Sequence, residues 1–299
     1  MFRRSRFQRS NDAPPIHLTE RDLAIIRHVH KHRFLRSTHV RKLVGGSSDV
    51  VLRRLQLLFQ HGYLDRPRAQ IDYYRRGSQP ITYGLGHKGA RELAQHFGIE
   101  PGKVDWTDKN RSINRLYLEH TLAVADVMVA IELACRDKAH ARLIAVDEFA
   151  TAKEQWNVTV RHRGKSEKLG VIPDKVFALE FPNEPHKTAL VFLEADRATM
   201  PVVRPGLKQT SFFRKMLAYH ESWQQKLHAS LFGHQRCLVL TVTTSSPRVG
   251  TLIDANRTFN NGRGSGLFLF TDKNAVRACE NFLTLPFRNG RDETVTLAG

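Results

Sequence analysis

The sequence predicts an α+β protein with two domains, a small helical one that ends in a β-hairpin and a larger one with helices on a mixed sheet. Its 299 residues suffice for two domains of ordinary size. Apolar side chains recur at helical spacing in the first hundred residues, whereas short apolar runs alternate with helical stretches in the rest. With 41% hydrophobic and 25% charged residues, the composition is that of a folded globular chain and excludes wholesale disorder.

The first domain is preceded by a basic arm. Residues 1–17 carry four arginines and two prolines but few apolar side chains, which predicts a flexible segment. Order begins at Thr19, because Thr19 and Asp22 can form a capping box and Leu18 can pack on Leu23. The first helix therefore starts there and runs to about residue 34.

Two further helices and a hairpin follow. The second helix ends at Gly45-Gly46, and Ser47 or Ser48 caps a third helix that ends at Gly62. Apolar side chains at helical spacing give the third helix one buried stripe and leave its arginines and glutamines outside. The two hairpin strands and a closing helix are expected at 63–66, 81–85 and 88–97.

Three helices followed by a hairpin predict a winged helix-turn-helix over residues 18–100, in which the third helix enters a major groove and the wing touches the backbone. The charge agrees with this, because residues 1–115 hold 23 Lys and Arg against 10 Asp and Glu, whereas the whole chain has a net charge of +18. A surface for protein contacts or dimerisation is the alternative. The candidate DNA-binding residues are Ser47, Ser48, Arg53 and Arg54 on the helix and Arg66, Arg68, Arg75 and Arg76 on the wing.

Other site classes are disfavoured. His28, His30 and His32 alternate along a helix and so cannot converge on one metal ion. Three widely spaced cysteines give neither a disulfide framework nor a metal knuckle, and no apolar run is long enough to span a membrane. We therefore expect a cytoplasmic protein without a membrane partner.

The second domain is expected over residues 111–299, after a boundary at 98–110 that is rich in polar residues, Pro and Gly. A long amphipathic helix opens it, and alternating strands and helices then predict a mixed sheet with helices on its faces. The expected helices are 114–135, 207–227 and 249–259, and the expected strands are 143–149, 157–161, 171–181, 188–194, 237–242 and 267–270.

Acidic residues lie at the ends of two consecutive predicted strands. Glu194 and Asp196 are two apart, so both should project from one face of a strand, and Asp174 should meet them across a hairpin. Three converging carboxylates would hold Mg²⁺ or Mn²⁺, which can activate water against a phosphodiester. Solvated carboxylates at strand ends are the alternative.

This order of elements resembles the PD-(D/E)xK nuclease fold, the restriction-endonuclease-like fold. The resemblance implies metal-binding acids at Asp174 and Glu194. Asp196 stands where that family has its lysine, which favours a non-catalytic role. Lys215 and Tyr219 lie four apart on the next helix and resemble the Gln-x-x-x-Tyr helix of one nuclease branch, so Lys215 is a candidate for a relocated lysine.

The opening helix of that fold often donates another acid. Glu119 occupies the matching helix here, and the resemblance makes it a further candidate ligand. Whether the domain is an enzyme stays open, between a Mg²⁺-dependent endonuclease and a nuclease-like scaffold kept for binding.

Several short motifs follow one another along most of the chain: Leu18-Thr19-Glu20-Arg21-Asp22, Arg53-Arg54-Leu55, Gly62-Tyr63-Leu64, His120-Thr121-Leu122-Ala123, Pro173-Asp174, Leu193-Glu194-Ala195-Asp196 and Lys215-x-x-x-Tyr219. In this order they resemble the replication-relaxation family of bacterial plasmids and other mobile elements, over about residues 18–290. The resemblance implies an accessory protein that binds double-stranded DNA in replication, relaxation or mobilisation and contacts a relaxase or replication protein. Two alternatives stay open, a metal-dependent endonuclease and a homodimeric transcriptional repressor.

Overall fold

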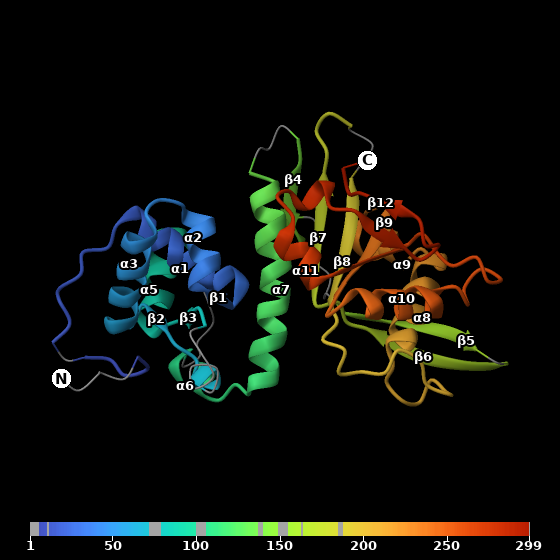
Figure 1. Ribbon diagram of the computed structural model, residues 1–299, viewed down its shortest axis with the longest axis horizontal. Helices are drawn as coiled ribbons and strands as arrows, with labels where there is room; N and C mark the ends of the chain where they lie inside the picture. Colours follow the sequence, from blue (N-terminus) through green and yellow to red (C-terminus); the bar gives the residue numbers. More distant parts are fainter. Residues whose placement is uncertain are drawn as a thin grey trace. The chain divides into compact units, whose positions relative to one another are not determined.

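The chain forms two compact units, unit 1 (Met1–Val129) and unit 2 (Ala130–Gly299) (Figure 1). The computed structural model describes residues 6–10, 12–71, 79–99, 106–136, 140–148, 155–162, 164–184 and 188–298. The two units meet in sequence within helix α7 (Arg115–Ala134), C-terminal to the segment 98–110 at which the sequence suggested a boundary. Within the described ranges, every helix is too short or too polar to cross a bilayer.

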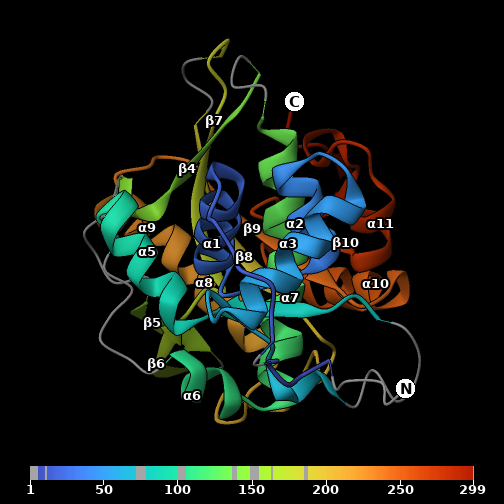
Figure 2. The ribbon, with the colours of Figure 1, turned by 90° about the vertical axis from the view of Figure 1, so that its left-hand side faces the viewer.

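Unit 1 is built around three packed helices, as its apolar periodicity predicts (Figure 2). The capping box is confirmed, since Thr19 accepts a hydrogen bond from the Asp22 amide and the Asp22 carboxylate accepts one from the Thr19 amide at 2.8 Å. Gly45 ends the second helix with a positive φ of 65°. The helices are α1 (Glu20–His32), α2 (Ser37–Val44), α3 (Ser48–Gln60), α5 (His87–Phe97) and α6 (Trp106–Arg111).

A small antiparallel sheet completes unit 1. The hairpin expected after α3 is present as β2 (Leu64–Asp65) and β3 (Thr82–Leu85), with the short helix η1 (Arg68–Gln70) in the connection. The sequence did not predict β1 (Phe34–Arg36), which pairs with β3 on its other edge. Gly84 makes this pairing possible, because a Cβ there would lie 2.7 Å from the Phe34 ring.

The first half of α7 belongs to unit 1. Its Leu118 and Leu122 pack against Phe34 in a small buried cluster. Asp126, one turn further on, forms ion pairs with Arg36 and with His39, the latter at 2.7 Å. These contacts explain why the N-terminal half of α7 is part of the first unit rather than a linker.

Unit 2 has the mixed sheet that the alternation of elements predicts. Its order is β12-β11-β10-β9-β8-β7-β4, in which β8, β9 and β10 run parallel and the other neighbours are antiparallel. The strands are β4 (Arg142–Ala145), β7 (Lys175–Glu180), β8 (Ala189–Ala195), β9 (Cys237–Thr243), β10 (Phe268–Asp272), β11 (Phe287–Asn289) and β12 (Thr294–Val295).

Helices and a second hairpin cover this sheet. The hairpin of β5 (Trp156–His162) and β6 (Lys165–Val171) contacts α8 (Phe212–Gln224). The remaining helical elements are α9 (Leu227–Phe232), α10 (Ser246–Asn256), α11 (Lys273–Ala278), η2 (Val146–Glu148) and η3 (Phe282–Thr284).

The strand expected at 171–181 is divided in two. β6 ends at Val171 and β7 begins at Lys175, with Pro173 between them. Proline has no backbone N–H for a sheet ladder, so it separates the strands. This break leaves Asp174 directly before β7, next to the end of β8.

Candidate functional site

The outward face of α3 is the part of unit 1 that matches the predicted DNA reader. Val51, Leu55, Leu58 and Phe59 are buried behind it. Exposed side chains recur at i, i+3, i+4 and i+7 on the opposite face: Asp49, Leu52, Arg53 and Gln56. Leu52, at 40% exposed, is an apolar side chain in the middle of a polar stripe. A helix with such a face can make both polar and methyl contacts.

The turn before α3 is surrounded by cations that no sequence pattern marks as candidates. Arg21, Arg41 and Lys42 are exposed on α1 and α2. The Arg21 guanidinium lies at the α2–α3 turn, 3.3 Å from the point where a Cβ on Gly46 would stand. The sequence around these residues does not indicate that they share a site, because only the fold brings α1 to this turn.

The serines at the start of α3 are available to a ligand in different degrees. Ser47 is the exposed N-cap residue and makes no side-chain capping hydrogen bond, while Ser48 is half-buried. The first-turn amides of a helix attract anions when no side chain caps them. The structure is therefore compatible with a phosphate at this terminus.

Arg54, the second arginine assigned to the reader helix, is turned into unit 1. Its Nε donates to Oδ1 of Asp22 at 2.9 Å, and its Nη2 donates to Oδ2 of the same carboxylate and to the backbone oxygen of His17. Burial alone would raise the pKa of Asp22, but the hydrogen bonds from Arg54 and Thr19 lower it. Arg54 thus neutralises a fully buried carboxylate, whereas the neighbouring Arg53 is exposed.

The arginines assigned to the wing also divide into two kinds. Arg66 is only 4% exposed and lies between the rings of Phe59 and Tyr83, 4.1 Å and 5.1 Å from their centroids. Arg68 on η1 is exposed. Arg75 and Arg76 lie outside the described residues.

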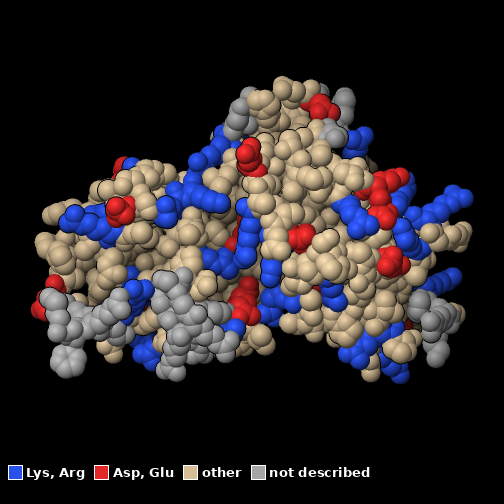
Figure 3. All heavy atoms as spheres, viewed as in Figure 1, with Lys and Arg blue, Asp and Glu red and all other residues tan. Residues whose placement is uncertain are grey.

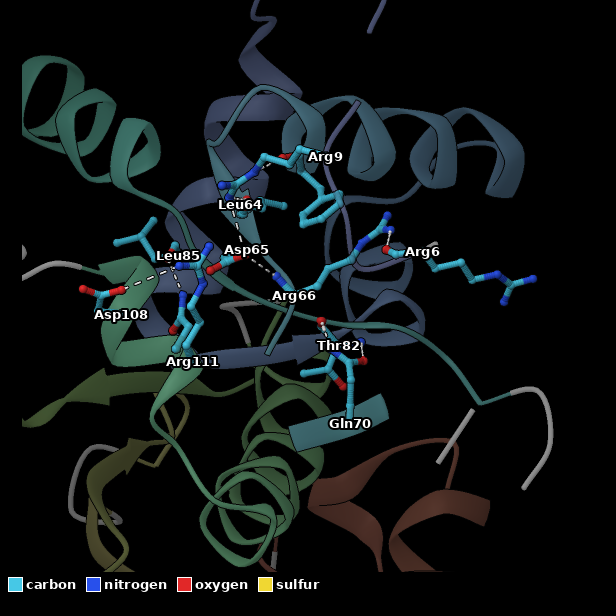
Figure 4. Close-up of polar contacts among 12 residues, drawn as sticks. Arg6, Arg9, Leu64, Asp65, Arg66, Gln70, Thr82, Leu85, Asp108 and Arg111 are labelled. Atoms are coloured by element: carbon cyan, nitrogen blue, oxygen red, sulfur yellow. Dashed lines mark hydrogen bonds and ion pairs between the residues drawn. The ribbon is translucent and has the colours of Figure 1, made fainter. Parts of the chain in front are cut away.

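The described part of the N-terminal arm is held against α3 and β2 (Figure 4). Arg9 donates to the backbone oxygens of Phe59 and Leu64, at 2.9 Å and 3.3 Å, and Arg66 donates to the backbone oxygen of Arg6. Further along, the Ser10 amide donates to the Gln60 side chain. The arginines that the sequence suggested for a flexible arm therefore include one, Arg9, with an intramolecular role.

The predicted acids of unit 2 come together in part. Asp174 lies beside the end of β8, where its amide donates to the Leu193 oxygen at 3.0 Å and its carboxylate accepts from the Ala195 amide at 2.7 Å. Glu194 stands between these two residues on β8, with its side chain only 3% exposed. The structure thus places Asp174 and Glu194 next to one another at the carboxyl end of β8.

Lys215 and Tyr219 from α8 complete this cluster. Lys215 Nζ lies 2.6 Å from Oε2 of Glu194, and the Tyr219 hydroxyl donates to Oε1 at 2.7 Å. Burial raises the pKa of Glu194 to about 7, against the opposing effect of Lys215 and with a further rise from Asp174. The spacing of four residues puts Lys215 and Tyr219 on one face of α8, and the fold brings that face to Glu194.

Asp196 points elsewhere. β8 ends at Ala195, so the alternation that should align Asp196 with Glu194 stops before it. Its carboxylate accepts from the Thr243 hydroxyl at 2.6 Å and from Arg248 Nε at 3.0 Å. Glu119 lies in unit 1 and pairs with Arg115, at 2.8 Å.

This donor set does not fit Mg²⁺ or Mn²⁺ as it is arranged. Both cations require several oxygen ligands at close range. Each oxygen of Glu194 accepts one hydrogen bond, from Lys215 or from Tyr219, and Asp196 is paired with Arg248. The Lys215 ammonium occupies the place of a cation beside Glu194, so Glu194 already has a counter-charge whenever it is ionised.

The distribution of charge on the surface is mixed. On the face shown in Figure 3, Lys and Arg side chains occur over both units, with acidic side chains among them. Net positive charge alone therefore does not locate a binding face, and the exposed stripe of α3 is the sharper criterion.

Comparison with known proteins identifies a family. A sequence model described as replication-relaxation matches residues 26–233, more than half of the chain, from α1 through α9. No curated protein and no solved structure matches.

Proposed function

This chain belongs to the replication-relaxation family, and we propose that it is a DNA-binding accessory protein of a plasmid or another mobile element. Family membership suggests a role in plasmid replication or relaxation. Within that role, unit 1 grips duplex DNA as a winged helix-turn-helix, and unit 2 contacts a protein partner such as a relaxase or a replication protein.

The exposed stripe of α3 is the observation that carries this proposal. A recognition helix must bury one face in its own domain and present polar side chains to base edges on the other. Arg53 suits the O6 and N7 acceptors of guanine, Gln56 suits adenine, and Leu52 suits the methyl group of thymine. The Oε1 of Gln56 also accepts a hydrogen bond from Arg66, which leaves its amide N–H groups as the donors for a base edge.

Phosphate contacts come from the cations around the α2–α3 turn. Arg21, Arg41 and Lys42 are exposed there, beside the uncapped first turn of α3. Arg68 on η1 adds one on the wing. Such contacts set register and affinity rather than sequence preference.

Unit 2 has a binding role in this proposal rather than a catalytic one. Its antiparallel hairpin β7–β8 followed by parallel β9 supports the likeness to a nuclease scaffold. The pairing of Glu194 with Lys215 and Tyr219 argues against an active metal site.

Duplex binding by the full-length chain tests the proposal. We expect binding of a labelled mixed-sequence duplex, measured by fluorescence anisotropy, to weaken steeply as salt is raised. Arg53→Ala should weaken binding by about 1–2 kcal/mol. The double variant Arg41→Ala/Lys42→Ala should reduce the slope of log Kd against log salt concentration by the equivalent of about one to two phosphate contacts. Arg161→Ala, which removes an exposed arginine of β5, is the matched control.

Two results would overturn the proposal. One is a folded protein that fails to bind duplexes even at low salt. The other is equal loss of affinity in Arg53→Ala and Arg161→Ala, which would mean that α3 is not the contact face.

A further inference from the structure

A pocket of about 150 Å³ opens beside the Glu194–Lys215 pair in unit 2. One side is formed by the end of β6 and the residues after it, and the other by the first two turns of α8 and the loop that precedes it. The polar side chains that line it are Glu194, Thr210, Ser211, Arg214, Lys215 and Tyr219.

The polar groups of this pocket are mainly donors. Both carboxylate oxygens of Glu194 are already bonded to Lys215 and Tyr219. Lys215 carries three N–H donors and uses one on Glu194. The Nε of Arg214 is buried and has no hydrogen-bond partner among the described residues. Among the side chains that line the pocket, two are cationic and one is a carboxylate that already accepts two hydrogen bonds, while Asp174, beside Glu194, lies outside the lining. This balance favours an anion as ligand.

Hydroxyl groups add to this donor set. Ser211 Oγ accepts from the Arg214 amide at 3.2 Å, so its own O–H can donate to a ligand. Thr210 is exposed at the mouth of the pocket. Oxyanions with several acceptor atoms match such a mixture of charged and hydroxyl donors.

The side chains, not the helix terminus, form this site. The amides of Phe212 and Phe213 in the first turn of α8 donate to the backbone oxygens of Pro201 and Val202, at 3.0 Å and 2.8 Å. These amides are therefore unavailable to a ligand. Arg214 and Lys215, one after the other on α8, supply the positive charge.

The rest of the wall is apolar. Val171, Ile172, Met200 and Ala218 line it, and Ile172 is 63% exposed. An exposed isoleucine at a charged pocket suits a ligand that has a carbon-rich body as well as an anionic head.

We propose that this pocket binds the phosphate monoester of a nucleotide, with Arg214, Lys215 and Ser211 on the phosphate and Ile172 and Met200 against the attached group. The phosphate belongs either to a free mononucleotide or to the 5′ end of a DNA strand. The site is independent of α3 and does not require that unit 1 bind duplex DNA.

Calorimetry on the full-length chain tests this, with inorganic phosphate, thymidine monophosphate, thymidine, and a thymidine dinucleotide with or without a 5′ phosphate as probes. The dinucleotides are too short for a duplex-reading surface, so failure here does not bear on the function of unit 1. We expect thymidine monophosphate or the 5′-phosphorylated dinucleotide to bind, and the unphosphorylated probes to bind at least tenfold more weakly. Preference between the two phosphorylated probes identifies the source of the phosphate.

Variants complete the test. Arg214→Gln should weaken binding of the phosphorylated probes about tenfold or more, and Thr210→Val, an exposed change that leaves the helix cap intact, should weaken it less. Arg236→Gln is the control. Arg236 is exposed and directly precedes β9, at the end of that strand away from Glu194. Unaltered binding in both pocket variants overturns the proposal, as does failure of every phosphorylated probe to bind the wild-type chain.

Discussion

Arg54 on α3 forms a two-point ion pair with Asp22 on α1, and Asp22 is completely buried. Two helices of unit 1 are thereby joined through one charged contact in its interior. The same carboxylate also accepts hydrogen bonds from the Thr19 amide and hydroxyl, at 2.8 Å and 2.7 Å. Asp22 therefore serves the cap of α1 and the packing of α3 at once.

Arg54→Ala is expected to destabilise the protein rather than to affect only DNA binding. It leaves the buried Asp22 carboxylate with its Thr19 hydrogen bonds but without a counter-charge, which should cost about 2–4 kcal/mol in free energy of unfolding. Urea denaturation of the full chain measures this. Arg53→Ala, an exposed neighbour on the same helix, should change stability by less than about 0.5 kcal/mol. Equal effects of the two substitutions would contradict the assignment of Arg54 to the interior.

On the wing, Arg66→Ala and Arg68→Ala should differ in the same way as Arg54→Ala and Arg53→Ala do on α3. Arg66 packs between two aromatic rings and donates to the Tyr83 hydroxyl at 3.1 Å, so Arg66→Ala should lower the free energy of unfolding by about 2–3 kcal/mol. Arg68→Ala should leave thermal stability unchanged and weaken duplex binding modestly. A duplex affinity that is insensitive to Arg68→Ala would exclude η1 from the interface.

Local sequence signals were sufficient where a few neighbouring residues determine the structure. The capping box of Thr19 and Asp22 marked the start of α1, and the four-residue spacing of Lys215 and Tyr219 indicated that both lie on one face of a helix. The alternation of apolar strands and helices likewise predicted a mixed sheet. Each of these rests on contacts within one turn of helix or on one period of a pattern.

Long-range contacts explain what the sequence did not give. β1 has three residues directly after a helix and exists because β3 pairs with it. Arg66 is buried because Phe59 and Tyr83, from different elements, enclose it. Asp196 turns to Arg248, which is 52 residues away along the chain. No local pattern distinguishes these arginines and acids from exposed ones.

We expect that the protein has no nuclease activity when a divalent metal ion is added. Because Lys215 and Tyr219 already bind the two oxygens of Glu194, we expect neither nicking of supercoiled plasmid with Mg²⁺ or Mn²⁺ nor a metal-dependent rise in Tm. The double variant Asp174→Ala/Glu194→Ala is the matched control. Metal-dependent nicking that disappears in the double variant would establish the endonuclease alternative instead.

The free energy of unfolding of Glu194→Gln should rise relative to that of the wild type as pH rises. Burial raises the pKa of Glu194 to about 7, whereas a glutamate in the unfolded chain titrates near 4.3. Between these values the folded state holds a proton that the unfolded state has lost, so the stability of the wild type falls as pH increases from about 4.5 to 7. Glutamine does not titrate, and urea denaturation at about pH 5 and pH 8 should show the variant gaining on the wild type. Glu180→Gln, which removes a half-exposed carboxylate paired with Arg142, is the matched control. A constant difference between Glu194→Gln and wild type across this range would mean that Glu194 is ionised throughout, with Lys215 as its permanent counter-ion.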